Sequence, residues 1–363
     1  MINRVLLGKI GRAALRKADA LAGRVYQLQA TLDAMALRPF ELHLEFTNLC
    51  NADCVFCPYQ FQQSDIQFMS DDIFNRAVAD YVACGGGSVG LTPIVGDALI
   101  HPRFLQRVRY LRSLPQIDRI WLTTNGILLD RFGIREILGS GLSSITISTA
   151  GFDEAMYERI YRSHSYHRMR RNVTALVEEN SRLAEPLSIT IALRPDRPIE
   201  EVLKDADFQP ILAHNPAVDF AWAFASIGGK VTRESLPHHM QLRFVRSKSE
   251  ACVQTYNGPI VLADGQVMAC SCVAAMDASA DLNIGDLQTA SLVDIWRGEE
   301  LRRFRDSFRN GSLNGTCATC DMYRNLDLYR SSEGRTRAAL NARRAASEVV
   351  HRPDAPRGPF PGG

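Results

Sequence analysis

The sequence lacks long apolar runs, a strong charge imbalance and a secretory leader. No apolar run approaches the ~18 residues of a membrane-spanning helix, so no transmembrane span is expected. The 42 lysines and arginines nearly balance the 40 aspartates and glutamates, which gives no electrostatic reason to expect a nucleic-acid partner. The N-terminus has no compact apolar core followed by a small-residue cleavage site, so we expect a cytoplasmic protein.

Cysteine is the residue type that is present in an informative number. The 363 residues include nine cysteines. In a cytoplasmic protein, that number indicates metal binding or catalysis rather than disulfides. The length allows one large α/β domain together with a smaller one.

Short β-rich runs alternate with helical stretches from residue 41 onward. The expected strands are ELHLEFT (41–47), SVGLTPIV (88–95), RIWLTT (119–124), SITIST (144–149), LSITIAL (187–193) and VDFAWAFA (218–225). The expected helices span 71–84, 102–113, 131–140, 153–182 and 199–214. This alternation predicts βα units with right-handed crossovers, and therefore an α/β fold with a partial (β/α)6 TIM-like barrel.

The pattern changes after residue 230. Residues 260–269 read as a hairpin with Asp264-Gly265 at its turn, and residues 291–308 read as an amphipathic helix. These features predict a small C-terminal α+β domain. The expected organisation is a basic helical segment (1–38), a barrel (39–230), the small domain (231–330) and a helix followed by a disordered tail (331–363). The basic segment packs on the barrel in the simplest interpretation, and binds a membrane surface or an anionic partner in the alternative.

Three cysteines lie close together in NLCNADCVFCPYQ, directly after the first expected strand. Cys50, Cys54 and Cys57 follow a C-x3-C-x2-C spacing, and no fourth cysteine is near. Structural zinc sites close with four ligands, and an iron–sulfur cube normally takes four cysteines. Three thiolates therefore leave one coordination position open for an outside ligand. Barrel enzymes place their chemistry on loops at the carboxyl ends of strands, which is where this motif falls.

With Phe56 before the last cysteine, this motif resembles the signature of the radical S-adenosylmethionine (radical SAM) superfamily. The resemblance implies a 4Fe-4S cluster whose open iron binds S-adenosylmethionine (SAM). It also implies reductive cleavage of SAM to a 5′-deoxyadenosyl radical that abstracts hydrogen from a substrate. A flavodoxin- or ferredoxin-type reductant would supply the electron. The cofactor would carry the difficult chemistry, and the protein would orient it.

Further loops after expected strands are similar to the SAM-binding loops of that family. The resemblance assigns SAM-binding roles to Gly96, Asp97, Asn125, Ser148 and Arg194. The triplet Val95-Gly96-Asp97 departs from the family's Gly-Gly-Glu-Pro pattern, and Asp97 as a helix N-cap is the alternative. The Asn-Gly pair of TTNG (123–126) also suits a tight turn by itself, and Arg194 also suits the surface.

A second set of cysteines lies near the C-terminus. Cys252, Gly265 and Cys270 fit C-x12-G-x4-C, and a C-x2-C pair follows at Cys317 and Cys320. This arrangement resembles the SPASM and shorter twitch extensions of radical SAM enzymes. The resemblance implies a second, auxiliary 4Fe-4S cluster held by these four cysteines. A four-cysteine zinc site is the alternative.

Two cysteines remain outside both sets. Cys272 is interpreted as a spare thiol, with a substitute ligand or a substrate-side residue as the alternatives. Cys84 ends an expected helix and is interpreted as structural.

The reaction follows from the two expected clusters. Abstracting hydrogen from an alcohol carbon leaves a radical that must lose one electron and one proton to become a carbonyl. A second cluster accepts such an electron, so the chain resembles radical SAM dehydrogenases acting on small polar or sugar- or cyclitol-type substrates. Peptide modification, as in sulfatase maturation, and epimerisation with Cys272 or Cys84 as hydrogen donor are the alternatives. Trp222, His164, Tyr166 and His167 are candidate substrate-side residues, and a base is sought among them.

Overall fold

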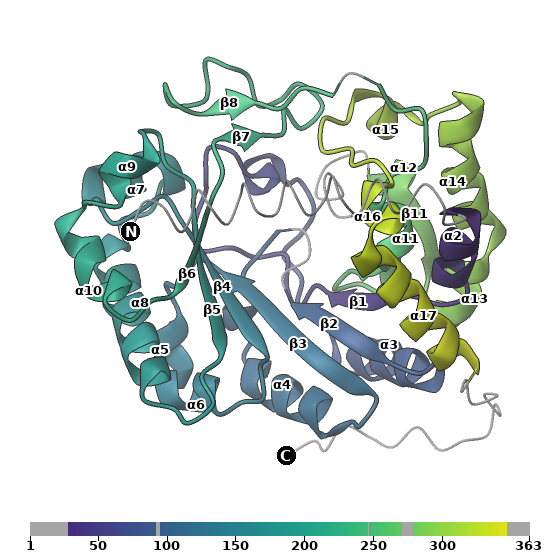
Figure 1. Cartoon of the computed structure of the whole chain (residues 1–363), viewed down its shortest axis with the longest axis horizontal. Helices are drawn as coiled ribbons and strands as arrows, with labels where there is room; N and C mark the ends of the chain where they lie inside the picture. Colours follow the sequence, from purple (N-terminus) through teal and green to yellow (C-terminus); the bar gives the residue numbers. More distant parts are fainter. Residues whose placement is uncertain (1–27, 92–94, 246, 271–278, 347–363) are drawn as a thin grey trace.

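The computed structural model describes residues 28–91, 95–245, 247–270 and 279–346. Within these residues, nine strands form one continuous sheet in the order β11-β10-β9-β1-β2-β3-β4-β5-β6. Strands β7 (Ala223–Phe224) and β8 (Gln241–Leu242) form a separate parallel pair. Figure 1 shows the large sheet running through the molecule, with this pair at the top of the view.

The first six strands are parallel neighbours, as the sequence predicts for a partial barrel. They are β1 (Glu41–Leu44), β2 (Gly87–Leu91), β3 (Ile117–Thr124), β4 (Ser144–Thr149), β5 (Ser188–Leu193) and β6 (Ala217–Phe220). Their alternation separates two faces, because successive side chains of a strand point to opposite sides. In β4, Ile145, Ile147 and Thr149 are fully buried while the intervening residues are half-buried.

Helices connect these strands and cover one face of the sheet (Figure 1). They are α3 (Asp71–Ala83), η3 (Ala98–Ile100), α4 (Phe104–Ser113), α5 (Leu129–Phe132), α6 (Ile134–Leu138), α7 (Glu154–Tyr161), α8 (Tyr166–Ser181), α9 (Ile199–Val202), η4 (Ala206–Phe208) and α10 (Gln209–Leu212). Local capping sets where several begin: the Ser70 hydroxyl accepts from Ile73 N at 3.2 Å, and Asp153 Oδ1 accepts from Met156 N at 2.8 Å.

Five expected elements are broken in the structure. The helix expected over 131–140 is divided at Gly133 into α5 and α6, and the helix expected over 199–214 is divided into α9, η4 and α10. The helix expected over 153–182 is divided because Arg162 takes a left-handed conformation with φ 47° between α7 and α8. The strand expected over 218–225 is shared between β6 and β7, which belong to different sheets. The helix expected over 291–308 is divided at Gly298, whose ψ of 163° lies outside the helical region.

The C-terminal third adds three strands to the same sheet. Strands β9 (Ile260–Val261), β10 (Gln266–Met268) and β11 (Asn283–Asp286) continue it, and β9 pairs parallel with β1. The expected hairpin is present, and Gly265 occupies its turn with φ 95°. The helices here are α11 (Gln254–Asn257), α12 (Ser279–Leu282), α13 (Leu292–Arg297), α14 (Glu299–Asn310), α15 (Gly315–Thr319), α16 (Asp327–Arg330) and α17 (Ser332–Ala346).

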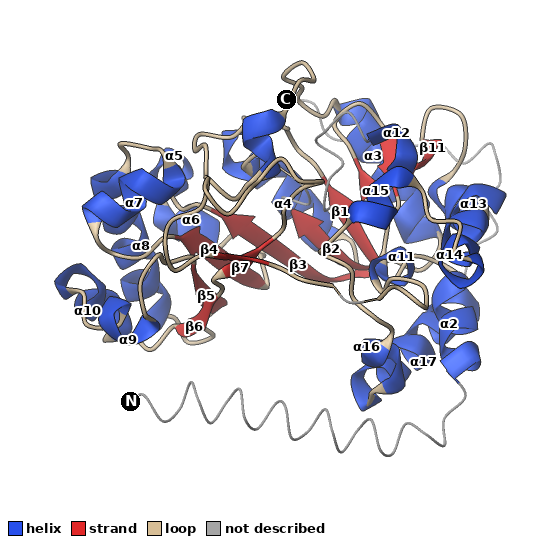
Figure 2. Cartoon of the chain, turned by 90° about the horizontal axis from the view of Figure 1, so that it is seen from above, coloured by secondary structure: helices blue, strands red, loops and turns tan. Residues whose placement is uncertain are grey.

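The two ends of the described chain pack together. Helix α2 (Leu28–Ala36) contacts α17, and both views place them side by side (Figure 2). Asn341 is fully buried and donates to the carbonyl oxygens of Ala34 at 2.8 Å and Arg38 at 3.0 Å. Its own side-chain oxygen accepts from the buried Arg38 guanidinium at 2.8 Å. The side-chain amide of Asn341 therefore has partners for both its nitrogen and its oxygen.

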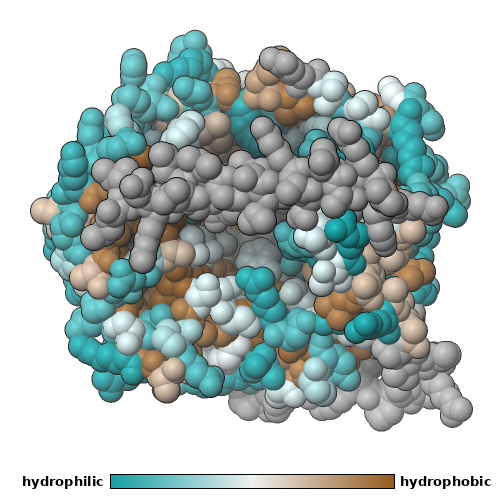
Figure 3. All heavy atoms as spheres, in the orientation of Figure 1, coloured by the Kyte–Doolittle hydropathy of each residue, from teal (hydrophilic) through white to brown (hydrophobic). Residues whose placement is uncertain are grey.

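No helix in the described part of the chain combines the length and the apolarity that a membrane span requires. Figure 3 shows one face of the molecule, where hydrophilic residues follow most of the outline and apolar residues are visible in patches between them.

Candidate active site and cluster centres

The loop that carries Cys50, Cys54 and Cys57 is fixed by hydrogen bonds that do not involve its thiols. Asp53 N and Val55 N donate to the carbonyl oxygens of Tyr161 at 3.1 Å and Ile160 at 2.9 Å, which end α7. Gln60 Nε2 donates to the carbonyl oxygens of Val55 at 2.9 Å and Cys57 at 3.1 Å. The backbone is therefore held while the sulfur atoms stay available.

The three thiols themselves lie in a largely dry environment. Burial raises the pKa of Cys50 to about 12 and that of Cys57 to about 11, and it holds the pKa of Cys54 well above its usual value. Thiols ligate metals as thiolates, and a bound cationic centre supplies the charge that stabilises them. Three such thiols on one fixed loop fit an iron–sulfur cluster with one position left open.

The loop after β2 packs directly on the cysteine loop. A Cβ on Gly96 would lie 2.2 Å from the carbonyl oxygen of Thr47, and its φ of 82° also favours glycine. Asp97 is buried, and its backbone N–H donates to Leu49 O at 2.9 Å. Its carboxylate accepts from Thr124 Oγ1 at 2.6 Å, from Asn125 N at 3.1 Å and from Leu99 N at 3.0 Å. The bond to Leu99 is an N-cap, the alternative role that the sequence allowed.

Of the remaining predicted SAM-binding residues, Asn125 lies nearest to the thiols. Its Nδ2 donates to Asn51 Oδ1 at 2.6 Å and lies 3.8 Å from Cys50 Sγ. The Ser148 hydroxyl lies 2.9 Å from Tyr161 Oη, so it reaches the cysteine loop through α7. Arg194 is half-buried and its guanidinium donates to Leu193 O at 3.0 Å. The structure thus places Gly96, Asp97 and Asn125 beside the cysteine loop. Ser148 is separated from that loop by Tyr161.

A second cysteine site lies beside the barrel. Cys252, Cys270, Cys317 and Cys320 line one cavity, which Phe304 and Phe308 of α14 also border. Burial, followed by the neighbouring Cys320 and Cys252, raises the pKa of Cys317 to about 12. Four thiols are the type and number of ligands that an iron–sulfur cube takes from a protein.

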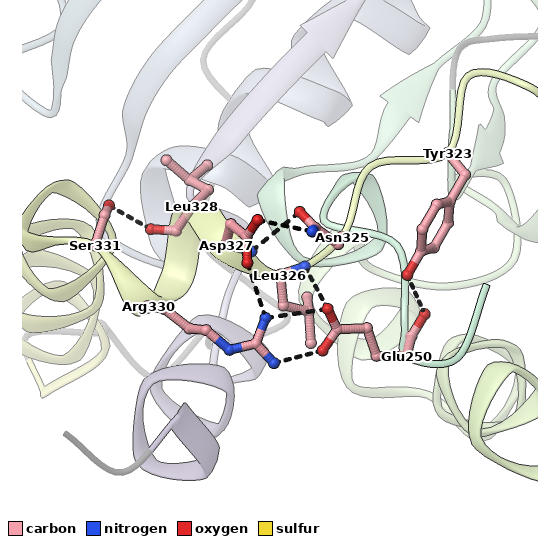
Figure 4. A network of polar contacts seen from close by, with 8 residues as sticks. All are labelled: Glu250, Tyr323, Asn325, Leu326, Asp327, Leu328, Arg330 and Ser331. Carbon is pink, nitrogen blue, oxygen red and sulfur yellow. Dashed lines mark hydrogen bonds and ion pairs between the residues drawn. The ribbon is translucent and has the colours of Figure 1, made fainter. Parts of the chain in front are cut away.

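A polar network holds the segments on both sides of this cavity. Glu250 pairs with Arg330, and its Oε1 accepts from Leu326 N at 3.2 Å (Figure 4). Tyr323 Oη donates to the carbonyl oxygen of Glu250 at 3.0 Å. The hydrogen bond from Arg330 lowers the pKa of Glu250, so this carboxylate stays charged. The network ties the chain before Cys252 to the chain after Cys320.

A short bridging segment (residues 221–243) joins the two cysteine sites. Phe56, next to Cys57, stacks on Phe224 of β7 with ring centroids 4.6 Å apart. Two residues later, Ser226 N donates to Asp321 Oδ2 at 2.6 Å, and Asp321 follows Cys320. Figure 1 shows β7 and β8 at the top of the view, with α15 further along the same edge. The bridging segment therefore touches a neighbour of each cysteine set.

The sequence also suggested residues that lie elsewhere. His164 and His167 are exposed, and they pair with Glu158 at 2.7 Å and Glu154 at 3.0 Å. These exposed pairs do not support a role as buried bases. Cys84 is buried at the end of α3, where its thiol donates to Tyr81 O at 3.2 Å, as a structural cysteine would. Cys272 lies outside the described residues.

Sequence reasoning missed Glu45 and His43. They alternate along β1 with Leu44 and Phe46, and Phe46 packs on helix side chains, so Glu45 and His43 face the barrel interior. Glu45 is 5% exposed and accepts from Ala263 N at 3.4 Å. Burial raises its pKa to about 7, and the nearby Asp264 carboxylate adds to the rise. The sequence did contain a signal for them, because polar residues alternate with apolar residues in ELHLEF (41–46).

Family models match both parts of the chain. The radical SAM superfamily model matches residues 44–208, and the SPASM iron-sulfur cluster-binding domain model matches residues 252–321. Together the matches span more than half of the chain. The chain therefore belongs to the radical SAM superfamily and carries a C-terminal SPASM domain. Its cofactors are accordingly a 4Fe-4S cluster, SAM and auxiliary iron–sulfur, and the cysteine sets lie within the two matched ranges.

Curated relatives include GTP 3′,8-cyclases. The enzyme of Actinobacillus succinogenes is 24% identical over 56% of this chain and 63% of its own length. The enzyme of Chlorobaculum tepidum is 28% identical over 42% of this chain and 43% of its own length. The chain thus spans about half the length of these relatives.

Solved structures agree on the fold. SuiB of Streptococcus suis bound to precursor peptide SuiA is 13% identical, with a TM-score of 0.56 over 82% of this chain and 74% of that chain. The enzyme anSMEcpe with bound AdoMet is 14% identical, with a TM-score of 0.53 over 86% of this chain and 99% of that chain. The partial barrel with an added cluster domain is therefore a shared architecture.

Proposed function

We propose that this enzyme oxidises an alcohol or C–H carbon of a small polar substrate of the sugar or cyclitol type. When bound, the first cluster and SAM supply a 5′-deoxyadenosyl radical that removes one hydrogen atom from the substrate. The substrate radical then loses one electron to the second cluster and one proton to the protein, which gives a carbonyl. The observation that carries this proposal is the four-cysteine cavity bridged to the first site, because an oxidation needs an electron acceptor near the radical.

The inner face of the barrel suits a hydroxylated substrate. Ser144, Thr146 and Ser148 share the face of β4 opposite its buried residues, and Thr190 follows the same pattern in β5. Half-buried hydroxyls both donate and accept hydrogen bonds, so they select substrates that carry several hydroxyl groups.

Glu45 is the proposed proton acceptor. It directly follows β1 and continues the inner face of that strand, five residues before the first cysteine of the SAM-binding set. A carboxyl group with a pKa of about 7 takes and releases a proton near neutral pH, which is the property a general base needs.

A peptide substrate is the second candidate. The observation in its favour is the two-stranded β7–β8 sheet, whose short strands are suited to accept an extended peptide through main-chain hydrogen bonds. The GTP 3′,8-cyclase relatives support shared radical chemistry, but their identity of 24–28% over part of the chain does not specify a GTP substrate.

The test compares the wild-type protein with a Cys50→Ala/Cys54→Ala/Cys57→Ala variant after anaerobic reconstitution. Iron and sulfide content with Mössbauer spectra should show two cubes in the wild type and one in the variant. The variant should also lose SAM cleavage, because the open iron site is gone. With candidate polyols, the wild type should form one carbonyl per 5′-deoxyadenosine.

Two results would contradict the proposal. SAM cleavage that persists in the triple variant would place the radical chemistry elsewhere. A single cube in the wild type, with zinc at the C-terminal cysteines, would remove the electron acceptor and favour a redox-neutral reaction such as epimerisation.

A further inference from the structure

An ammonium group lies against the second cysteine site. Lys248 Nζ donates to the carbonyl oxygens of Cys317 at 2.6 Å and Ala318 at 2.7 Å. Both carbonyls belong to α15, the helix that presents the CATC pair. A lysine at the last carbonyls of a helix is a common cap, so helix stabilisation is the simplest account of this contact.

The sulfur atoms of the same site also receive backbone N–H groups. Met322 N donates to Cys320 Sγ at 3.3 Å, and Arg324 N lies 3.5 Å from Cys252 Sγ. Positive charge and N–H groups near cluster sulfurs stabilise an added electron, because reduction makes the cluster more negative. The local field at the second site therefore favours uptake of an electron.

The surroundings of the first site are mixed, because backbone N–H groups of Asn51 and Ala52 lie against the Cys50 thiol while carboxylates lie close by. Its cysteine loop contains the half-exposed Asp53, which pairs with Arg162 at 3.4 Å, and packs on the buried Asp97. Asn125 Nδ2, 3.8 Å from Cys50 Sγ, is a more distant donor than the two N–H groups of the second site.

We propose that Lys248 raises the reduction potential of the cluster held by Cys252, Cys270, Cys317 and Cys320, and so makes this site the electron acceptor. The inference rests on the proposed function, since it concerns the electron that substrate oxidation releases. That electron moves from the substrate radical to the second cluster, and the accompanying proton moves to Glu45. A one-electron protein acceptor of the flavodoxin or ferredoxin class then reoxidises the cluster.

Asp281 provides a counterpart of opposite charge at the same helix. Its Oδ2 accepts from Thr316 N at 3.1 Å and Thr316 Oγ1 at 3.0 Å, one residue before Cys317. Neutralising this carboxylate should therefore shift the potential of the second cluster in the direction opposite to the loss of Lys248.

The experiment is a potentiometric titration of the anaerobically reconstituted full chain, followed by electron paramagnetic resonance. In Lys248→Met, the ratio of reduced to oxidised second cluster at a fixed potential should fall about tenfold, a shift of about 59 mV for one electron. Lys248→Arg should restore the wild-type value, and Asp281→Asn should raise the ratio. Lys204→Met is the matched control, because it removes the same charge from an exposed residue two positions after α9. Figure 1 shows α9 on the opposite side of the molecule from α15.

If Lys248→Met lowers the melting temperature but leaves the midpoint potential of the second cluster unchanged, Lys248 only caps α15 and the inference is overturned. If Lys248→Met fails to hold the second cluster, Asp281→Asn decides: a midpoint that does not rise overturns the inference. The titration needs no substrate, so it is separable from the proposed function. A wild-type enzyme that forms no oxidised product would defeat the oxidation while leaving a Lys248 effect on the midpoint intact.

Discussion

Glu45 is a carboxyl group in the wall of the barrel that titrates near neutral pH. In Glu45→Gln, we expect product formation to fall by 10²–10⁴, the usual contribution of a general base. Because a base acts only when deprotonated, the wild-type rate should rise as pH increases through about 7, the pKa of Glu45. The variant should lose this rise. The measurement is the pH dependence of kcat for carbonyl formation.

Glu41→Gln is the control for this prediction, since Glu41 lies on the same strand face and accepts from Asn257 Nδ2 at 2.7 Å. It should keep the pH dependence. The free energy of unfolding tests the raised pKa of Glu45 a second time, in protein without cofactors. The folded-state pKa is raised from 4.5 to about 7, so stability falls as pH rises through that window. In the wild type the free energy of unfolding should fall by roughly 3 kcal/mol across this window, and Glu45→Gln should abolish that fall. A pH dependence of kcat that is unaltered in Glu45→Gln would exclude Glu45 as the base.

A functional residue is predicted from the sequence most readily when the residues that act with it are close to it in the chain. Cys50, Cys54 and Cys57 lie within eight positions, so their spacing alone indicates a shared site. Gln60 carries no such signal, because its role of gathering loop carbonyls appears only once the loop is folded. The pKa of Glu45 depends on its burial in the folded chain, and then on the N–H of Ala263 and the charge of Asp264. Both residues lie more than two hundred positions away, so no local sequence pattern indicates this pKa.

At the scale of elements, the bridging segment contacts a neighbour of each cysteine site. Phe224→Ala removes the stack on Phe56, a contact worth about 0.5–1.5 kcal/mol beyond the buried area. We expect hydrogen exchange to accelerate about tenfold in residues 222–226 and 241–243. The strands β1 to β5 should keep their protection. Exchange followed by mass spectrometry on the full chain measures this effect.

Phe208→Ala is the matched control for the bridging segment. Phe208 stacks on Phe152 at 4.5 Å in the barrel wall, with a geometry close to that of the Phe56–Phe224 pair. Its removal should accelerate exchange around α8 and α10 and leave the bridging segment unchanged. Equal acceleration in both variants would mean that Phe224 stabilises the whole chain rather than the bridge.

The elements themselves are predicted well where their pattern is periodic. The six barrel strands overlap the short β-rich runs that the sequence shows, and Asp264-Gly265 forms the expected turn. The breaks were missed because they depend on single backbone conformations. Arg162 in the left-handed region and Gly298 outside the helical region interrupt helices whose periodicity continues past them.

At the scale of the whole molecule, α17 closes the fold against α2. Asn341→Ala removes three hydrogen bonds and leaves the fully buried Arg38 with less polar contact. We expect a loss of about 3 kcal/mol in the free energy of unfolding. Denaturant unfolding measures it. Asn310→Ala, at the exposed end of α14, should change stability by less than about 0.5 kcal/mol. Similar values for both variants would contradict a closing role for Asn341.

The pairing of β9 with β1 has a consequence for how the protein is made. His43 of β1 is the neighbour of Ile260 of β9, so the ribosome synthesises most of the chain before that partner exists. Until then β1 is an open edge, which is a template for pairing with other chains. Nascent chains that are halted between the barrel and the SPASM domain should therefore aggregate. Efficient production should depend on rapid translation of the segment between them, or on a chaperone that binds the nascent chain during that time.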